Sequence, residues 1–190
     1  MRIHFRLMIG LGFAISTIAA AWGTGLKSGL SIGEIAVPFR PTHVTGPDAG
    51  TNTCPLCKYG PVPAVQVWIN GDKWENVEKI AETLEDQIAK AGPNRLKSFL
   101  VFIKPAGVSD RAEASQLKML AAKCGLHNVG LVYVDGPSDD AVTRYKINTA
   151  ASVKNTVVFY HDKTVCGNLV NVQGDGKGLA SLKSALQKMP

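Results

Sequence analysis

The chain has 190 residues, of which 45% are hydrophobic, 19% charged and 7% aromatic, and its formal net charge is +6. This is the composition of a globular protein, so collagen-like, coiled-coil and wholly disordered chains are excluded, and four cysteines are too few for a coreless disulfide scaffold. The lysines are scattered and not interleaved with aromatic residues, so no nucleic acid is expected as a partner.

The N-terminal segment predicts export. Basic residues precede an uncharged stretch, Leu7–Leu26, and Ala19–Ala21 supply the small residues that cleavage before Trp22 would need. Residues 1–21 are therefore interpreted as a signal peptide or as an uncleaved membrane anchor, because about 20 helical residues span a bilayer. Both interpretations place the rest of the chain outside the cytoplasm. We expect a periplasmic or secreted protein, or an anchored one that meets the membrane only through this segment.

Residues 22–63 form an irregular lead-in, because proline or glycine recurs every few residues. Short extended pieces such as Ile35–Phe39 lie between these breaks. The lead-in carries the Cys-x-x-Cys motif of the chain, Cys54-Pro55-Leu56-Cys57, which we place on a loop.

From residue 64 the pattern becomes regular and predicts one domain over 64–190. Continuous apolar runs predict strands, and apolar residues three and four positions apart predict helices. The predicted strands are Ala64–Ile69, Ser98–Ile103, Val129–Val134, Thr156–Tyr160 and Val165–Val172, the last two joined by a turn at His161–Thr164. The predicted helices begin at the capping boxes Asp72/Glu75 and Asp110/Glu113 and at Ser138, and a last helix covers Leu179–Met189.

Alternating strands and helices predict an α/β sandwich, with a mixed sheet, helices on both faces and one antiparallel edge. This order resembles the thioredoxin-like fold in its peroxiredoxin and periplasmic-reductase form. Local motifs carry the same resemblance: Ile32-Gly33-Glu34 with Pro38-Phe39, and Tyr145-Lys146-Ile147 ahead of Thr156–Phe159. The resemblance covers about residues 31 to 189 and implies a three-layer thioredoxin-like sandwich.

The Cys-x-x-Cys motif indicates redox chemistry. Cys54 and Cys57 have the spacing at which one thiolate can be resolved by the other into a disulfide, and Lys58 adds a cation that lowers a thiol pKa. In an exported chain this predicts a thiol–disulfide oxidoreductase that acts on a thiol or disulfide of a partner protein, with Cys54 as nucleophile and Cys57 as resolving thiol. The alternative is a redox-silent binding module in which Cys54–Cys57 is a structural disulfide.

The position of the pair departs from the family pattern. Thioredoxins carry the motif directly after the first core strand, where residues 70–74 contain no cysteine here. The family also places a cis-proline before the hairpin strand, where Asn155 stands in this chain. These departures favour the binding module, whereas the motif and the compartment favour the oxidoreductase, so the sequence leaves both open.

A peroxidase is a third and weaker hypothesis. Pro47, Thr51 and Cys54 fit the spacing of the peroxiredoxin active loop. Those enzymes also use an arginine near the later hairpin, for which Arg144 and Lys154 are poor substitutes.

No metal or other cofactor is predicted. Zinc would need two ligands besides the pair, and Cys124 and Cys166 are expected to be buried in the core, Cys124 out of reach of thiol reagents. Lys58 stands where haem attachment would need a histidine.

The segment Cys54–Gly60 also resembles a group of exported bacterial thioredoxin-like proteins. That group carries Cys-x-x-Cys-x-Tyr-Gly ahead of the first core strand. The resemblance implies fold and export and leaves the activity open.

Overall fold

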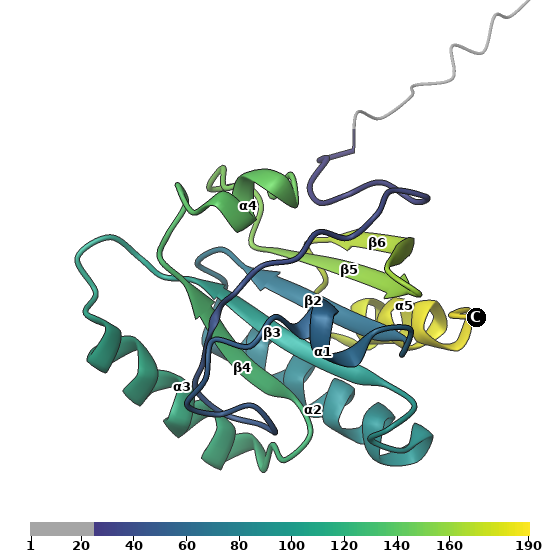
Figure 1. The fold of residues 1–190 in the computed structure, drawn as a ribbon, viewed down its shortest axis with the longest axis horizontal. Coiled ribbons are helices and arrows are strands. Elements are labelled where there is room, and N and C mark those ends of the chain that lie inside the picture. Colours follow the sequence, from purple (N-terminus) through teal and green to yellow (C-terminus); the bar gives the residue numbers. More distant parts are fainter. Residues whose placement is uncertain (1–24) are drawn as a thin grey trace, which may run out of the picture.

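The computed structural model describes residues 25–190 (Figure 1). The predicted signal peptide or anchor, residues 1–21, lies outside the described residues. Among the helices of residues 25–190, none has both the length and the hydropathy that a membrane span requires.

Six strands form one mixed sheet in the order β1-β4-β3-β2-β5-β6. β2, β3 and β4 are parallel to one another, while β5 and β6 continue the sheet antiparallel on one side and β1 on the other. Every residue of β2 is buried, because this central strand is covered on both faces. The strands are β1 (Thr42–His43), β2 (Ala64–Ile69), β3 (Lys97–Ile103), β4 (Gly130–Val134), β5 (Asn155–His161) and β6 (Thr164–Val170).

Helices cover both faces of the sheet (Figure 1). The helices are α1 (Pro55–Tyr59), α2 (Trp74–Ala91), α3 (Asp110–Cys124), α4 (Asp140–Arg144) and α5 (Gly176–Gln187). Alternate residues of β2 serve two separate cores, since Val65 and Val67 pack with α2, α3 and α5, whereas Ala64 and Trp68 pack with α1, α4 and the lead-in.

The predicted α/β sandwich is confirmed, with every strand and helix expected beyond residue 64 present. The hairpin turn between β5 and β6 also forms, with Asp162 and Lys163 at positive φ (45° and 63°). Two features of the lead-in differ from the prediction. β1 adds a second antiparallel edge beside β4, and the cysteine motif lies in helix α1 where a loop was expected.

Both predicted helix caps are wrong by one residue. Lys73 precedes α2 without a side-chain cap, because the carboxylate of Asp72 accepts hydrogen bonds from the amides of Asn76 and Asn155. At α3 the cap is Ser109, whose hydroxyl accepts the N–H of Ala112. Tertiary partners therefore compete with local capping for the same oxygen.

Candidate functional site

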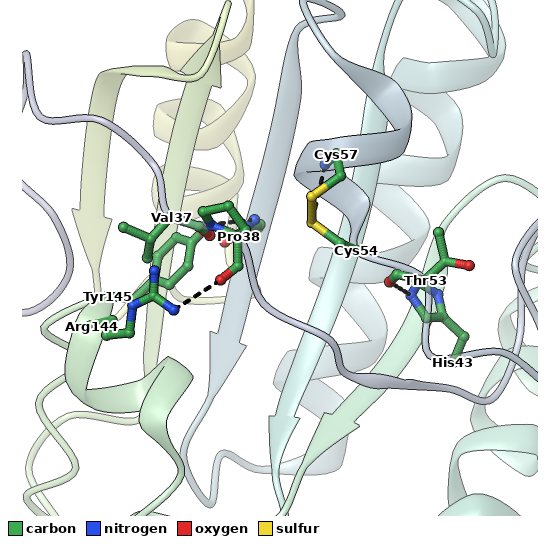
Figure 2. Close-up of a disulfide and its surroundings, with 9 residues drawn as sticks. Val37, Pro38, His43, Thr53, Cys54, Cys57, Arg144 and Tyr145 are labelled. Carbon is green, nitrogen blue, oxygen red and sulfur yellow. Dashed lines mark hydrogen bonds between the residues drawn. A yellow bond between two sulfur atoms is a disulfide. The ribbon is translucent and has the colours of Figure 1, made fainter.

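The Cys-x-x-Cys motif forms the expected disulfide at the start of α1, on the face of the sheet opposite α2 (Figure 2). The Cα atoms of Cys54 and Cys57 lie 5.2 Å apart. Cys54 is the N-cap residue, and its Sγ accepts the N–H of Cys57 at 3.1 Å. Pro55 occupies the first helical position, where a missing N–H costs nothing. Residues of the motif itself therefore cap and start the helix.

The two cysteines differ in exposure. Cys54 is only 4% exposed and packs with Leu56 and Phe39 in the core beneath α1. Cys57 is exposed, because it points away from the face of α1 that Leu56 buries. This reverses the order expected for Cys54 as nucleophile, and Cys57 is the end of the disulfide that a partner can reach.

A groove of about 360 Å³ lies beside the disulfide and is lined by both cysteines. Its apolar part comes from Phe39, Val134 and Ala141, and its rim carries Arg40 and Arg144 together with Asp139 and Asp140. The Nη1 atom of Arg144 donates to the carbonyl of Pro38 at 3.2 Å, so α4 holds the lead-in segment that forms one wall (Figure 2).

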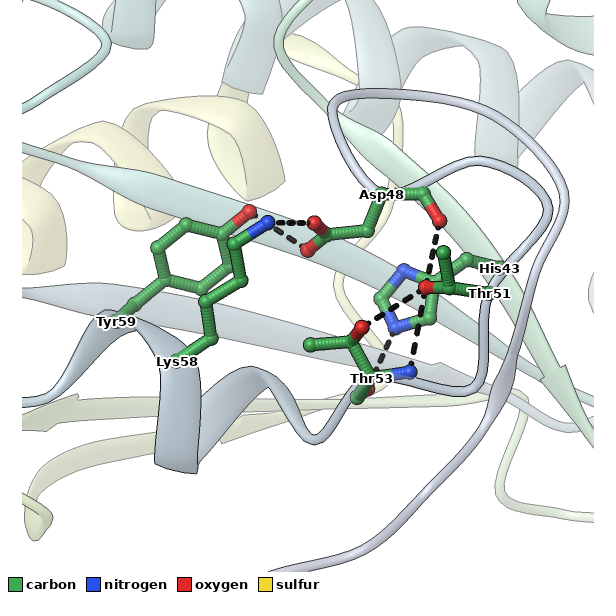
Figure 3. Close-up of polar contacts among 6 residues, drawn as sticks. All are labelled: His43, Asp48, Thr51, Thr53, Lys58 and Tyr59. Carbon is green, nitrogen blue, oxygen red and sulfur yellow. Dashed lines mark hydrogen bonds and ion pairs between the residues drawn. The ribbon is translucent and has the colours of Figure 1, made fainter.

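A buried carboxylate anchors the C-terminal end of α1 (Figure 3). The side chain of Asp48 is 3% exposed, forms an ion pair with Lys58, and accepts the hydroxyl of Tyr59 at 2.6 Å. Burial raises the pKa of Asp48, but the hydrogen bonds from Lys58 and Tyr59 outweigh it, so the pKa lies below its ordinary value. The Nζ atom of Lys97 covers the ring of Tyr59 at 4.6 Å from its centroid.

A buried histidine anchors the N-terminal side of the motif (Figure 3). His43 on β1 hydrogen-bonds through Nε2 to the carbonyl of Thr53 at 2.8 Å, so Nε2 carries the proton. Its Nδ1 atom is buried and has no hydrogen-bond partner within residues 25–190, and burial lowers the pKa of His43. Thr51 adds a hydroxyl bond to the carbonyl of Asp48 at 2.9 Å.

The loop that supplies these groups needs a glycine. Gly46 has φ +81°, and a Cβ atom there would lie 2.8 Å from the Cα atom of Gly130 on β4. With the loop held against the sheet, His43 and Asp48 fix both flanks of the Cys-x-x-Cys motif. The backbone around the two sulfurs is therefore held by contacts other than the disulfide.

The position at which thioredoxins carry their cysteines has no redox group in this chain. Asn155, which stands at the position of the family's cis-proline, is fully buried and donates to Asp72 (2.6 Å) and to the carbonyl of Val172 (2.9 Å), while its Oδ1 accepts the N–H of Val172 (2.8 Å). Asn76 bonds to the same carboxylate and carbonyl. No cis peptide bond occurs in residues 25–190. An amide–carboxylate network thus closes this position.

The remaining cysteines stay apart from the pair. Cys124 and Cys166 are free and pack against the core as expected, but both are only partly buried. Cys124 is the last residue of α3, where the helix end leaves one side of the thiol uncovered. In the part of the chain that the structure describes, no cluster of three or more His, Cys, Asp or Glu side chains could hold a metal ion.

The groups proposed for a peroxidase are only partly assembled. Arg144 and Cys54 line the same groove, which the sequence did not indicate. The hydroxyl of Thr51 is engaged with the Asp48 carbonyl on the other side of the motif. Cys54 is also buried, so a peroxide has poor access to its sulfur.

Sequence reasoning missed the residues that hold the motif. His43 and Asp48 lie in a proline- and glycine-rich stretch with no periodic pattern, and their partners are side chains or carbonyls about ten residues away. The signal available was Asp48 itself, a lone acid ahead of a Cys-x-x-Cys motif that is followed by Lys58 and Tyr59.

Comparison with known proteins defines the fold. No family model and no curated protein matches the chain. Among solved structures it is similar to a candidate protein disulfide isomerase from Bacteroides thetaiotaomicron, with 15% identity, a TM-score of 0.60, and 86% of this chain and 94% of that chain covered.

Two further structures are similar over comparable lengths. A candidate thiol:disulfide interchange protein DsbE from Chlorobium tepidum is 11% identical with a TM-score of 0.60, covering 83% of this chain and 96% of that one. The thiol peroxidase from Chromobacterium violaceum is 15% identical with a TM-score of 0.58, covering 84% and 88%. The chain therefore has the thioredoxin-like fold, as the sequence resemblance implied.

Proposed function

We propose that this chain is an exported thiol–disulfide oxidoreductase that acts through Cys54 and Cys57, outside the usual position of the fold. One observation carries the proposal: Cys54 is 4% exposed, whereas Cys57 faces solvent beside a groove. A disulfide with one reachable sulfur and one shielded sulfur has a defined direction of attack, on which the rate and outcome of thiol exchange depend.

Exchange begins when a partner thiolate attacks the Sγ atom of Cys57. A new disulfide joins the partner to Cys57, the Cys54–Cys57 bond breaks, and the electron pair stays on the Sγ atom of Cys54. There the N–H of Cys57 is already placed to donate a hydrogen bond to the thiolate. This donor favours Cys54 as the leaving group.

A second partner thiolate then attacks the partner's own sulfur and releases Cys57. The partner dithiol is oxidised to a disulfide, and its two electrons and two protons end on Cys54 and Cys57 as thiols. In the reverse direction Cys57 attacks a partner disulfide, and Cys54 resolves the mixed disulfide. The roles are the opposite of those that the sequence suggested.

The same contacts argue against a purely structural disulfide. Closing so short a loop contributes about 2 kcal/mol in the chain-entropy account. His43 and Asp48 already hold both flanks of the motif, so the covalent bond has little further ordering to supply.

Export is part of the proposal. The uncharged N-terminal stretch supports it, and so does the disulfide itself, since disulfides persist in oxidising compartments. A redox-silent binding module is the second candidate, and the closed network around Asn155 favours it, because the usual catalytic position of the fold carries no redox group.

The experiment compares Cys54→Ser with Cys57→Ser in a Cys124→Ser/Cys166→Ser background. Each variant keeps one thiol of the pair, which is reacted with insulin as a disulfide probe, and mixed disulfides are counted by mass spectrometry. We expect Cys54→Ser to trap insulin at least about tenfold faster than Cys57→Ser, because only Cys57 is exposed.

The wild-type pair should also have a reduction potential above about −300 mV and should catalyse insulin reduction. A lower potential without activity would overturn the enzyme in favour of the binding module. Faster trapping by Cys57→Ser would refute the assigned direction of attack.

A further inference from the structure

A second groove, of about 640 Å³, lies between β6 and α5 and shares no lining residue with the groove of the disulfide. Its apolar lining includes Phe159, Leu169 and Met189. Among the described residues, no acidic side chain lines it. The interior of the groove is therefore apolar, and the polar residues of its rim decide which partners can approach it.

The rim of this groove is a basic stripe along α5 and its C-cap residue, Lys188. Lys177, Ser181, Ser184 and Lys188 follow one another at four, three and four residues, so they lie on one face of the helix, and all four line the groove. Both lysines are exposed. Within residues 25–190 neither forms an ion pair, and α5 contains no acid. The two lysines of the rim are therefore not held in ion pairs with other described residues.

Exposed aliphatic side chains continue the groove along the edge strand. Ile32 is 71% exposed and lines the groove itself. Ile35 (61% exposed) pairs with the start of β6, and Leu26 (48% exposed) borders its far end. These are three of the five large hydrophobic side chains exposed in residues 25–190. Their gathering beside one strand marks an interaction surface.

We propose that this face, formed by Leu26, Ile32, Ile35, Lys177, Lys188 and the groove, docks on an anionic lipid bilayer. Aliphatic side chains with unpaired lysines around them match the acyl boundary and the charged headgroups of such a surface. The proposal does not depend on the redox function of Cys54 and Cys57.

The course of the chain supports a bilayer as the occupant. Residues 25–35 run beside β6, as Figure 1 shows for the start of the described chain. The uncharged stretch Leu7–Leu26 leads into them and begins within residues 1–21, the segment interpreted as a signal peptide or anchor. The β6–α5 face therefore lies beside the residues that directly follow the predicted signal or anchor, and docking there would extend membrane contact beyond the N-terminus, to which the sequence confined it.

Two native thiols give a matched readout on the full chain. Cys166 lines the groove, Cys124 ends α3, both are free and half-buried, and burial raises the pKa of both. Alkylation by N-ethylmaleimide, an uncharged reagent, is followed by mass spectrometry with phosphatidylglycerol or phosphatidylcholine vesicles. We expect phosphatidylglycerol vesicles to slow the alkylation of Cys166 at least about fivefold and to change the alkylation rate of Cys124 less than about twofold.

The charge dependence is tested by two double variants. Lys177→Gln/Lys188→Gln removes the rim charge and should reduce the protection of Cys166 below about twofold, since each lysine near an anionic surface contributes about fivefold in affinity. Lys118→Gln/Lys183→Gln removes the same charge from exposed positions outside the groove and should leave protection intact. Molar salt should abolish protection.

Other outcomes overturn the proposal. Equal protection of Cys124 and Cys166, or equal protection by phosphatidylcholine, would mean that no anionic surface meets this face. Protection by monomeric octanoate without protection by vesicles would assign the groove to a small amphiphile. Equal loss of protection in the two double variants would mean that the protection of Cys166 depends only on the net charge of the protein and not on the lysines of the groove.

Discussion

Replacing Asp48 by asparagine tests whether the buried carboxylate holds α1. The substitution keeps the volume of the side chain and removes its charge, so the bonds from Lys58 and Tyr59 lose their ionic partner. A hydrogen bond to a charged group contributes about 1.5–3 kcal/mol. The Lys58 side chain is 46% exposed and stays solvated, so its ion pair adds little. We expect the free energy of unfolding to fall by about 2 kcal/mol, most of it through Tyr59.

The pH dependence has a definite sign. The pKa of Asp48 is lower in the folded chain than in the unfolded chain, so the unfolded state binds more protons in acid. The stabilisation is complete above the unfolded pKa of about 4 and is lost as the pH falls through the folded value. The difference between wild type and Asp48→Asn should therefore be constant near pH 7 and shrink below about pH 4.

Urea unfolding at pH 7, 5 and 3 measures this difference, with Glu34→Gln as the control. Glu34 also pairs with a lysine, Lys146, but at the surface, where solvent screens the pair. The control should change stability less than Asp48→Asn. Unchanged stability of Asp48→Asn at pH 7, or a difference that is not reduced at pH 3, would refute the anchoring role.

Three further predictions concern other parts of the chain. Burial lowers the pKa of His43, so below about pH 6.5 the unfolded chain binds a proton that the folded chain does not. The free energy of unfolding should therefore fall as the pH drops below about 6.5. His43→Gln should flatten the dependence of the urea midpoint on pH in this range. Asn155→Ala removes a buried amide with three hydrogen bonds and should lower the free energy of unfolding by about 3 kcal/mol, measured by urea, with insulin trapping at Cys57 unchanged. If the signal is cleaved, N-terminal sequencing should find Trp22 near the start, whereas intact Met1 in a membrane fraction would show an anchor.

The sheet and its covering helices could be predicted because burial imposes a period on the sequence. β2 reads as one continuous apolar run, since both of its faces are covered. β1 could not be found in this way, because two residues carry no period. The cap of α2 was misassigned since the carboxylate of Asp72 binds Asn155, which lies 83 residues further along the chain. Local rules describe what a side chain can do, and the tertiary structure selects among those uses.

The cysteine pair could be predicted from its spacing, but its direction of attack could not. Exposure of Cys57 depends on which side of α1 meets the core, and a helix of one turn has too few residues to show an apolar stripe. The anchors at His43 and Asp48 depend on a loop folding back over α1, which no local pattern encodes.

This fold offers two positions for a redox-active cysteine pair, the start of α2 and helix α1. The surroundings of the two positions favour the one on α1. A reactive pair at the start of α2 would need an open approach past the loop that precedes β5. The start of β5 is instead fastened to Asp72 and Val172 by the buried amide of Asn155, whose polar atoms are all engaged within the chain. On the opposite face Cys57 is exposed, a groove lies beside it, and the lead-in segment carries Arg40 at the rim. Partner choice would therefore be decided by the lead-in and α4, and changes at Arg40 or Arg144 should alter exchange rates while changes around Asn155 alter only stability.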